Sequence, residues 1–327
     1  MQPKTQIIAV TGAAGFIGSC LLKELNNRGI KEILTVDHLN HELKKENLKG
    51  KGFIEYFEKD EFLELVKKNS LPQQIKCLIH MGACSSTTLQ DRHYFEKNNF
   101  EYSRILAEWS LHHKIRYIYA SSAETYGDGS YGYKEDEATI RKCQPLNFYG
   151  ESKQKFDLWV LDQKLNDQVV GLRFFNVFGP NEYHKGEMRS VIAKSYPKVI
   201  SEGKISLFKS YKKEYAHGEQ KRDFIYFKDA INIVLFFYDH PQISGIFNVG
   251  TGLARSWNEL AKALFTAVGK KPVIEYFDMP EVLKPRYQYF TEANVNKLKQ
   301  SGFDQPFSSL EDSIKDYVEY LKTQKHI

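Results

Sequence analysis

The stretch Val10-Thr11-Gly12-Ala13-Ala14-Gly15-Phe16-Ile17-Gly18 decides the fold. It follows a β-branched run and opens an amphipathic stretch, which predicts a tight turn between a strand and a helix. Small residues let backbone amides approach a pyrophosphate, and the N-terminus of the following helix gives that anion a favourable field. An ordinary strand–helix turn is the alternative, but Asp37 closes the next predicted strand, where an acidic side chain meets ribose hydroxyls. The pattern therefore predicts a dinucleotide-binding unit.

Working outward, short β-branched or aromatic runs alternate with longer amphipathic stretches as far as Phe174. The predicted strands span residues 7–11, 33–37, 53–57, 77–81, 116–120 and 169–174. Such alternation predicts a doubly wound parallel sheet, an α/β Rossmann-type fold. Beyond Phe174 the pattern loosens, residues 211–221 are expected to form a solvated, mobile loop, and helices resume only near 256–268 and 310–322.

Two parts are therefore expected. Residues 1–175 form the NAD(P)-binding domain. Residues 176–327 form a smaller α/β domain that is mainly substrate-binding, with some segments returning to the first.

Composition excludes several classes of protein. The chain has 327 residues, 42% of them hydrophobic, which is enough for a large core. Its 46 basic and 41 acidic residues are spread along the whole length, so no nucleic-acid partner is expected. No apolar run is long enough to cross a bilayer, and residues 1–11 lead into the first strand without a signal-peptide core. These features predict a cytoplasmic protein with no membrane partner.

The four cysteines are expected to be reduced thiols. They show no CxxC spacing, which argues against a zinc site and against a disulfide framework, and no metal is expected. They are Cys20, Cys77, Cys84 and Cys143.

Tyr149 and Lys153 fall one helical turn apart, so both side chains can reach one ligand. A phenol titrates near pH ~10, but a nearby ammonium and an oxidised nicotinamide ring both lower that pKa, so that Tyr149 can accept a hydroxyl proton. Ser122, at the end of a predicted strand, can hydrogen-bond the same oxygen. A helical Tyr–Lys pair and a strand-end serine also occur as plain structural features.

The preferred nicotinamide cofactor stays open at this point. Asp37 favours a free ribose 2′-hydroxyl, whereas Lys44 or Lys59 can hold a 2′-phosphate. Either lysine can equally be a surface residue.

These motifs resemble the extended short-chain dehydrogenase/reductase superfamily, through Gly12-x-x-Gly15-x-x-Gly18, Ser122 and Tyr149-x-x-x-Lys153. More narrowly, the chain resembles the ADP-glyceromanno-heptose 6-epimerase family. The segments that carry this likeness are Gly82-Ala83-Cys84-Ser85-Ser86-Thr87-Thr88, Asn98-Asn99, Phe174-Phe175-Asn176-Val177-Phe178-Gly179-Pro180, His184-Lys185-Gly186, Lys221-Arg222-Asp223-Phe224 and Arg286-Tyr287-Gln288.

The resemblance implies oxidation at C6″ of a heptose by NADP (NAD being possible), rotation of the ketone, and reduction from its opposite face. Tyr149 and Lys185 are then the two proton-transfer groups; the alternative for Lys185 is a loop lysine that binds the substrate diphosphate. The substrate is a small-molecule nucleotide sugar, the context is lipopolysaccharide core heptose synthesis, and the assembly is a homo-oligomer.

Two further sets of residues follow from the resemblance. The implied cofactor contacts are Gly12, Gly15, Phe16, Ile17, Gly18, Asp37, His38, Lys44, Lys59, Met81, Gly82, Ala83, Cys84, Ser85, Asn98, Tyr149, Lys153, Val177 and Lys185. The implied substrate contacts are Ser86, Ser122, Asn176, Glu187, Lys194, Phe208, Arg222 and Tyr287. A surface salt bridge for Arg222 and a core position for Phe208 are the alternatives.

The chain departs from the family pattern in three places. Glu187-Met188-Arg189-Ser190 replaces small residues, Lys194 replaces a histidine, and residues 210–220 form a longer, more charged loop. These departures leave the nucleotide and the sugar open, so a UDP- or GDP-sugar 4-epimerase remains an alternative. Glu124 follows Ala123 where related 4,6-dehydratases carry an Asp-Glu pair, which weakens a dehydratase function. A non-catalytic NAD(P)-sensing protein is a further alternative. The presence of all four reactive groups, Ser122, Tyr149, Lys153 and Lys185, argues against it.

Overall fold

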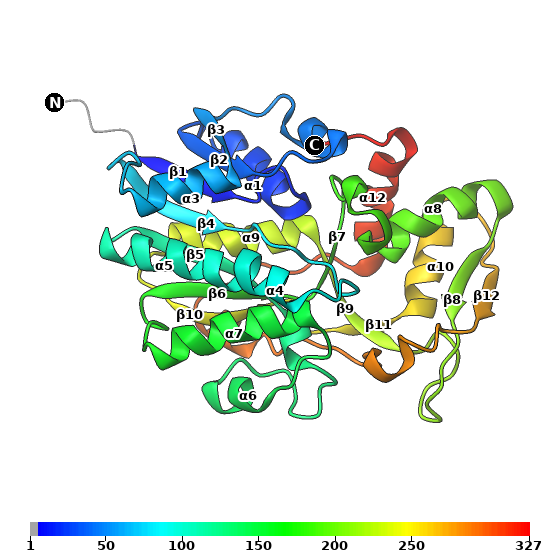
Figure 1. The fold of residues 1–327 in the computed structure, drawn as a ribbon. Coiled ribbons are helices and arrows are strands. Elements are labelled where there is room, and N and C mark those ends of the chain that lie inside the picture. The colour runs from blue at the N-terminus through cyan, green and yellow to red at the C-terminus, as the bar shows by residue number, and fades with distance from the viewer. Residues whose placement is uncertain (1–5) are drawn as a thin grey trace.

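The computed structural model describes residues 6–327 as an α/β protein built on a central seven-stranded sheet (Figure 1). All strands of this sheet are parallel, in the spatial order β10-β6-β5-β4-β1-β2-β3. In chain order they are β1 (Ile7–Thr11), β2 (Ile33–Asp37), β3 (Glu55–Glu58), β4 (Ile75–His80), β5 (Arg116–Ser122), β6 (Val169–Phe174) and β10 (Gly245–Val249). The strand order reverses between β1 and β4, and such a point opens a crevice at the carboxyl ends of the strands.

Helices cover both faces of this sheet because alternate strand residues are apolar on both sides. Ile8 and Val10 pack on one face, whereas Ala9 packs on the other. The first face carries α1 (Phe16–Asn27) and α9 (Phe227–Asp239), and the second carries α3 (Lys59–Lys67), α5 (Tyr102–His112) and α7 (Phe148–Asp162). Shorter helical segments lie in the connections: α2 (Glu42–Leu48), α4 (Arg92–Phe95), η1 (Glu96–Glu101), η2 (Ala123–Tyr126) and α6 (Glu137–Lys142).

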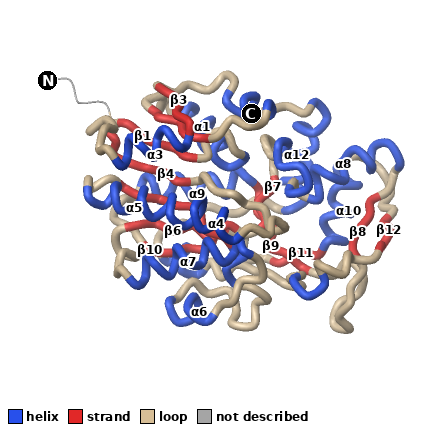
Figure 2. Tube along the Cα trace, viewed as in Figure 1, coloured by secondary structure: helices blue, strands red, loops and turns tan. Residues whose placement is uncertain are grey.

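Two small sheets and a helical layer lie beside the carboxyl edge of the central sheet (Figure 2). One sheet contains β7 (Asn176–Phe178), β9 (Lys221–Tyr226) and β11 (Ala254–Ser256), and the other contains β8 (Ile205–Phe208) and β12 (Ile274–Phe277). The helices α8 (Val191–Glu202), α10 (Trp257–Ala267) and α12 (Leu310–Thr323) pack on one another. The remaining turns are η3 (Tyr183–Met188), η4 (Lys284–Arg286) and α11 (Asn296–Gln300).

The α/β Rossmann-type fold predicted from the sequence is confirmed. The predicted bounds of β1, β2 and β6 match the structure, and β3 begins at Glu55 instead of 53. The expectation of a loosened pattern after Phe174 is wrong for three elements, because α8 and α9 lie there and β10 joins the central sheet. The expectation for residues 1–5 lies outside the described residues.

The loop expected to be solvated is partly anchored. Tyr211 donates a hydrogen bond from its hydroxyl to Asp278 Oδ1 over 2.6 Å, and Lys212 Nζ lies 4.8 Å from the centroid of the Tyr289 ring. Gln220 is fully buried, and β9 starts directly after it. Parts of this charged loop therefore pack against the rest of the protein, which its hydropathy does not indicate.

Candidate active site

The turn between β1 and α1 is closed by glycines that no other residue could replace without backbone movement. Gly12 has φ +69°, and a Cβ built on it would lie 2.6 Å from the Gly82 nitrogen. A Cβ on Gly18 would lie 2.1 Å from the Gly12 carbonyl oxygen. Helix α1 starts after Gly15 without any side-chain cap, so its first amides are available to an anion. The turn therefore fits a pyrophosphate.

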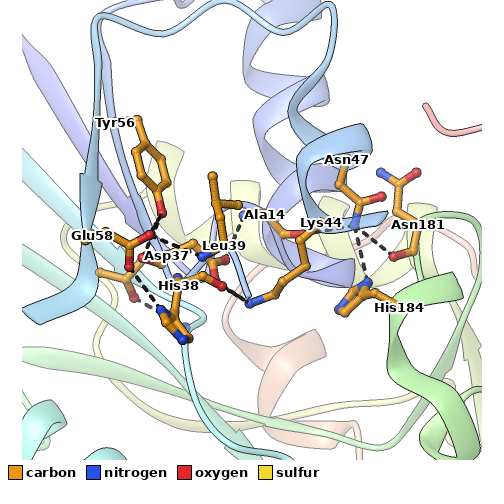
Figure 3. Close-up of polar contacts among 12 residues, drawn as sticks. Ala14, Asp37, His38, Leu39, Lys44, Asn47, Tyr56, Glu58, Asn181 and His184 are labelled. Carbon is orange, nitrogen blue, oxygen red and sulfur yellow. Dashed lines mark hydrogen bonds and ion pairs between the residues drawn. The ribbon is translucent and has the colours of Figure 1, made fainter. Parts of the chain in front are cut away.

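One end of the crevice suits an adenosine ribose (Figure 3). Asp37 Oδ2 accepts the Ala14 amide over 2.8 Å, and Asp37 Oδ1 accepts Lys44 Nζ over 2.5 Å. Lys59 donates to Asn98 Oδ1 over 2.6 Å. These four side chains, Asp37, Lys44, Lys59 and Asn98, line a cavity of about 270 Å³. The Lys44 ammonium offsets the Asp37 charge, and Lys59 adds a second ammonium group at this end.

The other end holds the predicted reactive groups. Tyr149, Lys153, Ser122 and Lys185 all line one cavity of about 630 Å³, which adjoins the first. Lys153 is only 4% exposed and donates to the Ala120 carbonyl oxygen over 2.7 Å, which holds it against the end of β5. The structure thus brings together groups that lie up to 63 positions apart in the sequence.

Local capping sets the direction of the helix that carries Tyr149. The Asn147 side chain caps α7 by accepting the Gly150 amide over 2.8 Å. Asn147 also donates to Glu124 Oε2 over 2.8 Å. Glu124 therefore supports the start of this helix from behind, and it does not line the cavity.

Burial has the largest influence on the pKa values of Tyr149 and Lys153. It raises the pKa of Tyr149 to about 12, an effect that Glu124 increases and a hydrogen bond with Ser122 opposes. Burial also lowers the pKa of Lys153 to about 8, against the opposing charge of Asp157. Burial is the largest of these influences, so the pKa of Tyr149 lies above its usual value in the protein alone. Additional positive charge from a bound ligand is needed to favour phenolate.

Lys185 reaches the same cavity from a separate element. It lies on η3, where Gly186 turns the chain with φ +53°. Within the described part of the chain, its Nζ makes one side-chain interaction, a cation–π contact in which it lies 5.8 Å from the centroid of the Phe16 ring. Burial lowers the pKa of Lys185, and the charge of Glu182 opposes that shift. An ammonium in this setting can lose its proton more easily than one in water.

Three residues expected at the substrate form their own cluster. Arg222 is 6% exposed, donates to the Lys221 and Gln288 carbonyl oxygens and lies 5.1 Å from the centroid of the Tyr287 ring. The Phe208 ring lies 6.3 Å from that of Tyr287. A surface salt bridge was the alternative for Arg222, but among residues 6–327 the Arg222 guanidinium forms no ion pair. This cluster lies outside both cavities.

The other expected positions divide in the same way. Ser86 and Val177 line the larger cavity, whereas the His38 ring lines the smaller one and pairs with Glu58 at 3.1 Å. Asn176 is exposed and lines neither cavity. Lys194 and Glu187 lie apart from both cavities and form a loose ion pair of 3.9 Å. The remaining expected cofactor residues, Gly12, Gly15, Phe16, Ile17, Gly18, Met81, Gly82, Ala83, Cys84 and Ser85, all line the larger cavity.

Several lining residues were missed from the sequence. They are Thr11, Val36, Asn40, His41, Tyr94, Tyr102, Ala120, Ser121, Phe174, Phe175, His184 and Met188. Thr11, His184, Met188 and the Phe174-Phe175 pair belong to segments already singled out, so the sequence carried a signal for them. The others reach the crevice through strand ends, loops and the helices α4 and α5, which no local pattern marks.

This fold and this site fit a class of protein: the Rossmann-type enzymes that act on their substrate with a nicotinamide dinucleotide. The family model described as "NAD dependent epimerase/dehydratase family" matches residues 8–250. The chain belongs to this family.

Relatives of known name agree with that assignment. The chain is 48% identical to the ADP-L-glycero-D-manno-heptose-6-epimerase of Nitratidesulfovibrio vulgaris strain DP4, over 95% of this chain and 97% of that protein. It is 44% identical to the enzyme of the same name from Fusobacterium nucleatum, over 96% and 97%. The Helicobacter pylori crystal structure of that name superposes with a TM-score of 0.82 at 28% identity, covering 99% of each chain. The family resemblance drawn from the motifs is confirmed, as is the predicted class of enzyme, a nicotinamide-dependent epimerase.

Within residues 6–327, no helix combines the length and the apolar character needed to cross a bilayer. The same part of the chain contains no group of three or more His, Cys, Asp or Glu side chains arranged to hold a metal ion.

Proposed function

We propose that the chain interconverts ADP-D-glycero-D-manno-heptose and ADP-L-glycero-D-manno-heptose at C6″, for the heptose of the lipopolysaccharide core. The observation that carries the proposal is that Tyr149 and Lys185 enter one cavity from different elements, α7 and η3. Oxidation, rotation of the ketone and reduction from the opposite face place the carbinol oxygen in two orientations, and two independent groups can exchange its proton, one in each orientation. The names of the relatives supply the substrate.

The cofactor of this proposal is NADP, held by residues that fit it. The turn from Gly12 to Gly18 would hold the pyrophosphate, and Lys44 and Lys59 would hold a ribose 2′-phosphate. When bound, this cofactor supplies a reversible hydride acceptor beside the substrate.

The residues of the chain then perform the proton chemistry. Tyr149 takes the proton of the C6″ hydroxyl, and Ser122 donates a hydrogen bond to the same oxygen. Lys153 adds positive charge beside the phenolate, which favours that ionised form. After the ketone has rotated and presents its opposite face to the cofactor, Lys185 donates a proton to the carbonyl oxygen as it is reduced. Arg222, with Phe208 and Tyr287 beside it, would face the nucleotide end of the substrate.

Product analysis tests the proposal. The purified enzyme is incubated with ADP-D-glycero-D-manno-heptose, and the configuration at C6″ is followed by NMR; we expect an equilibrium mixture of both epimers. UDP-glucose and GDP-mannose are incubated in parallel. No change at C6″, together with conversion of a hexose at C4, would assign the enzyme to the 4-epimerases, whereas loss of water would indicate a dehydratase.

The remaining parts of the proposal concern assembly and location. We infer a homo-oligomer in the cytoplasm, from the family resemblance. Light scattering of the purified chain and fractionation of cells that express it test these two points.

A further inference from the structure

Helix α2 carries two side chains that point to different parts of the crevice. Lys44 reaches Asp37 at the adenosine end, and Asn47, three residues later on the same face, reaches toward η3 (Figure 3). Asn47 is fully buried although it is polar. A buried amide group without hydrogen-bond partners destabilises the fold, so the partners of the Asn47 amide show why this residue can be buried.

The Asn47 amide joins the pyrophosphate turn to the start of the Lys185 segment. Its Nδ2 donates to the Ala14 carbonyl oxygen over 2.9 Å and to the Asn181 carbonyl oxygen over 3.0 Å. The same nitrogen lies 3.4 Å from His184 Nδ1, next to Lys185 in the chain. Its Oδ1 accepts a hydrogen bond from His326 Nδ1 over 2.6 Å. One side chain thus joins the pyrophosphate turn to the segment that leads to Lys185.

The segment around Lys185 is anchored through its neighbours. Asn181 is fully buried, donates to Ser19 Oγ over 2.9 Å and accepts the Ile327 amide over 3.0 Å. Glu182, 1% exposed, accepts hydrogen bonds from the hydroxyls of Ser190 and Tyr317 over 2.6 and 2.8 Å. Within residues 6–327 the Lys185 ammonium contacts only the Phe16 ring, and the Lys185 amide donates to the Glu182 carbonyl oxygen over 3.0 Å, so the position of Lys185 depends on these anchors.

We propose that Asn47 is a positioning residue for Lys185, coupling the pyrophosphate turn to the second proton-transfer group. This inference rests on the proposed function, because it takes Lys185 as that group. Loss of the Asn47 amide would free Asn181 and His184 from the turn and let η3 move. A displacement of about 1 Å at a reacting group is enough to slow a reaction substantially.

A double-mutant cycle tests the coupling. We expect Asn47→Ala to lower kcat roughly tenfold with little change in the KM for the substrate, and Lys185→Met to lower kcat roughly 100-fold. If Asn47 acts through Lys185, the double variant is no slower than Lys185→Met, within twofold. If the reductions in kcat of the two single variants multiply in the double variant, the inference is overturned.

A matched control separates positioning from loss of stability. Asn26 also donates from Nδ2 to two backbone carbonyl oxygens, those of Ile30 and Gly52, and accepts the Gly52 amide, away from the cavities. Asn26→Ala should lower the Tm by a comparable amount and leave kcat within twofold of wild type. A kcat lowered equally by both variants would overturn the inference while leaving the proposed function intact.

A second readout needs no turnover. Hydrogen–deuterium exchange of a peptide covering residues 182–190 should be faster in Asn47→Ala than in wild type, and unchanged in Asn26→Ala. Unchanged exchange in Asn47→Ala would overturn the inference. If Asn47→Ala does not fold, His326→Ala, which removes the hydrogen bond to Asn47 Oδ1, replaces it in the cycle and in the exchange measurement under the same criteria. A wild-type rate in Lys185→Met would instead refute the proposed role of Lys185, and the inference would fall with it.

Discussion

Lys44 Nζ lies 2.5 Å from Asp37 Oδ1, and this ion pair is mostly buried at the adenosine end of the crevice. The same nitrogen donates to the His38 carbonyl oxygen over 2.9 Å. The acidic side chain that would favour a free 2′-hydroxyl is thereby neutralised by a cation suited to a 2′-phosphate. The sequence left these two effects in balance, and the proposal of NADP as the cofactor rests in part on this ion pair.

Replacing Lys44 should therefore change cofactor preference. We expect Lys44→Ala to weaken NADP binding roughly tenfold or more, because a charge-assisted hydrogen bond to the phosphate is lost. Binding of NAD should change less. Titration calorimetry with both cofactors measures the difference.

Lys45→Ala is the control for this prediction, because Lys45 lies next to Lys44 on α2 but pairs only with exposed Glu42. It should bind both cofactors as wild type does. Equal losses for NADP and NAD in Lys44→Ala would show that Lys44 does not read the 2′ position.

A buried ion pair behind the catalytic helix provides a stability prediction. Arg173 and Asp157 are both fully buried, with Nη2 and Oδ2 2.8 Å apart, and Asp157 also accepts the hydroxyls of Tyr119 and Ser121. Asp157→Asn would leave the Arg173 charge buried without its counter-ion, which costs about 3–5 kcal/mol. Urea unfolding should show this loss.

Asp162→Asn is the matched control, since Asp162 lies on the same helix and forms an exposed ion pair with Arg141. Its free energy of unfolding should stay within about 0.5 kcal/mol of wild type. A similarly small change in Asp157→Asn would mean that the buried pair does not stabilise the fold.

The central sheet was predictable because its strands are continuous apolar runs separated by amphipathic helices. The glycine turn and the Tyr149–Lys153 spacing could also be predicted, because each involves residues that are close together in the sequence. Strand β10 was not, because Gly245–Val249 pairs with β6 across more than 70 positions and only the fold selects that partner. The same holds for Asn47 and Asn181, which are ordinary polar residues until tertiary structure buries them.

Protonation was the least predictable property. A sequence shows that a lysine stands near a tyrosine, but not how far both are removed from water. Burial is the largest influence on the pKa of Tyr149 and of Lys153, and it depends on the whole crevice. The lowering expected for Tyr149 also requires the positive charge of an oxidised nicotinamide ring, so it stays a prediction for the enzyme with its cofactor bound.

The lowered pKa of Lys153 predicts a pH-dependent stability. The folded pKa is about 8, against roughly 10.4 in an unfolded chain. Between these values the unfolded state holds a proton that the folded state has released, so stability rises with pH by about 1.4 kcal/mol per unit. This contribution is complete above the unfolded pKa and lost as pH falls to 8. Relative to Lys153→Met, wild type should gain roughly 2 kcal/mol between pH 7 and 9.5.

Chemical denaturation at both pH values measures this gain, with Lys155→Met as the control. Lys155 lies on the same helix but is exposed and pairs with Glu96. Its variant should follow wild type at both pH values. A constant difference between wild type and Lys153→Met would show that Lys153 is not held in a desolvated site.

The role of Tyr149 can be tested by removing one oxygen atom. Tyr149→Phe keeps the ring in the cavity but loses the proton acceptor, so kcat should fall about 100-fold or more while cofactor binding is spared. Tyr131→Phe deletes the same atom from a tyrosine that is 50% exposed and lines neither cavity of the crevice, so it should retain the wild-type rate. Steady-state kinetics and cofactor titration of both variants decide the matter. Full activity in Tyr149→Phe would remove the phenol from the mechanism, and the proton would then have to leave through Lys185, the other proton-transfer group proposed in the same cavity.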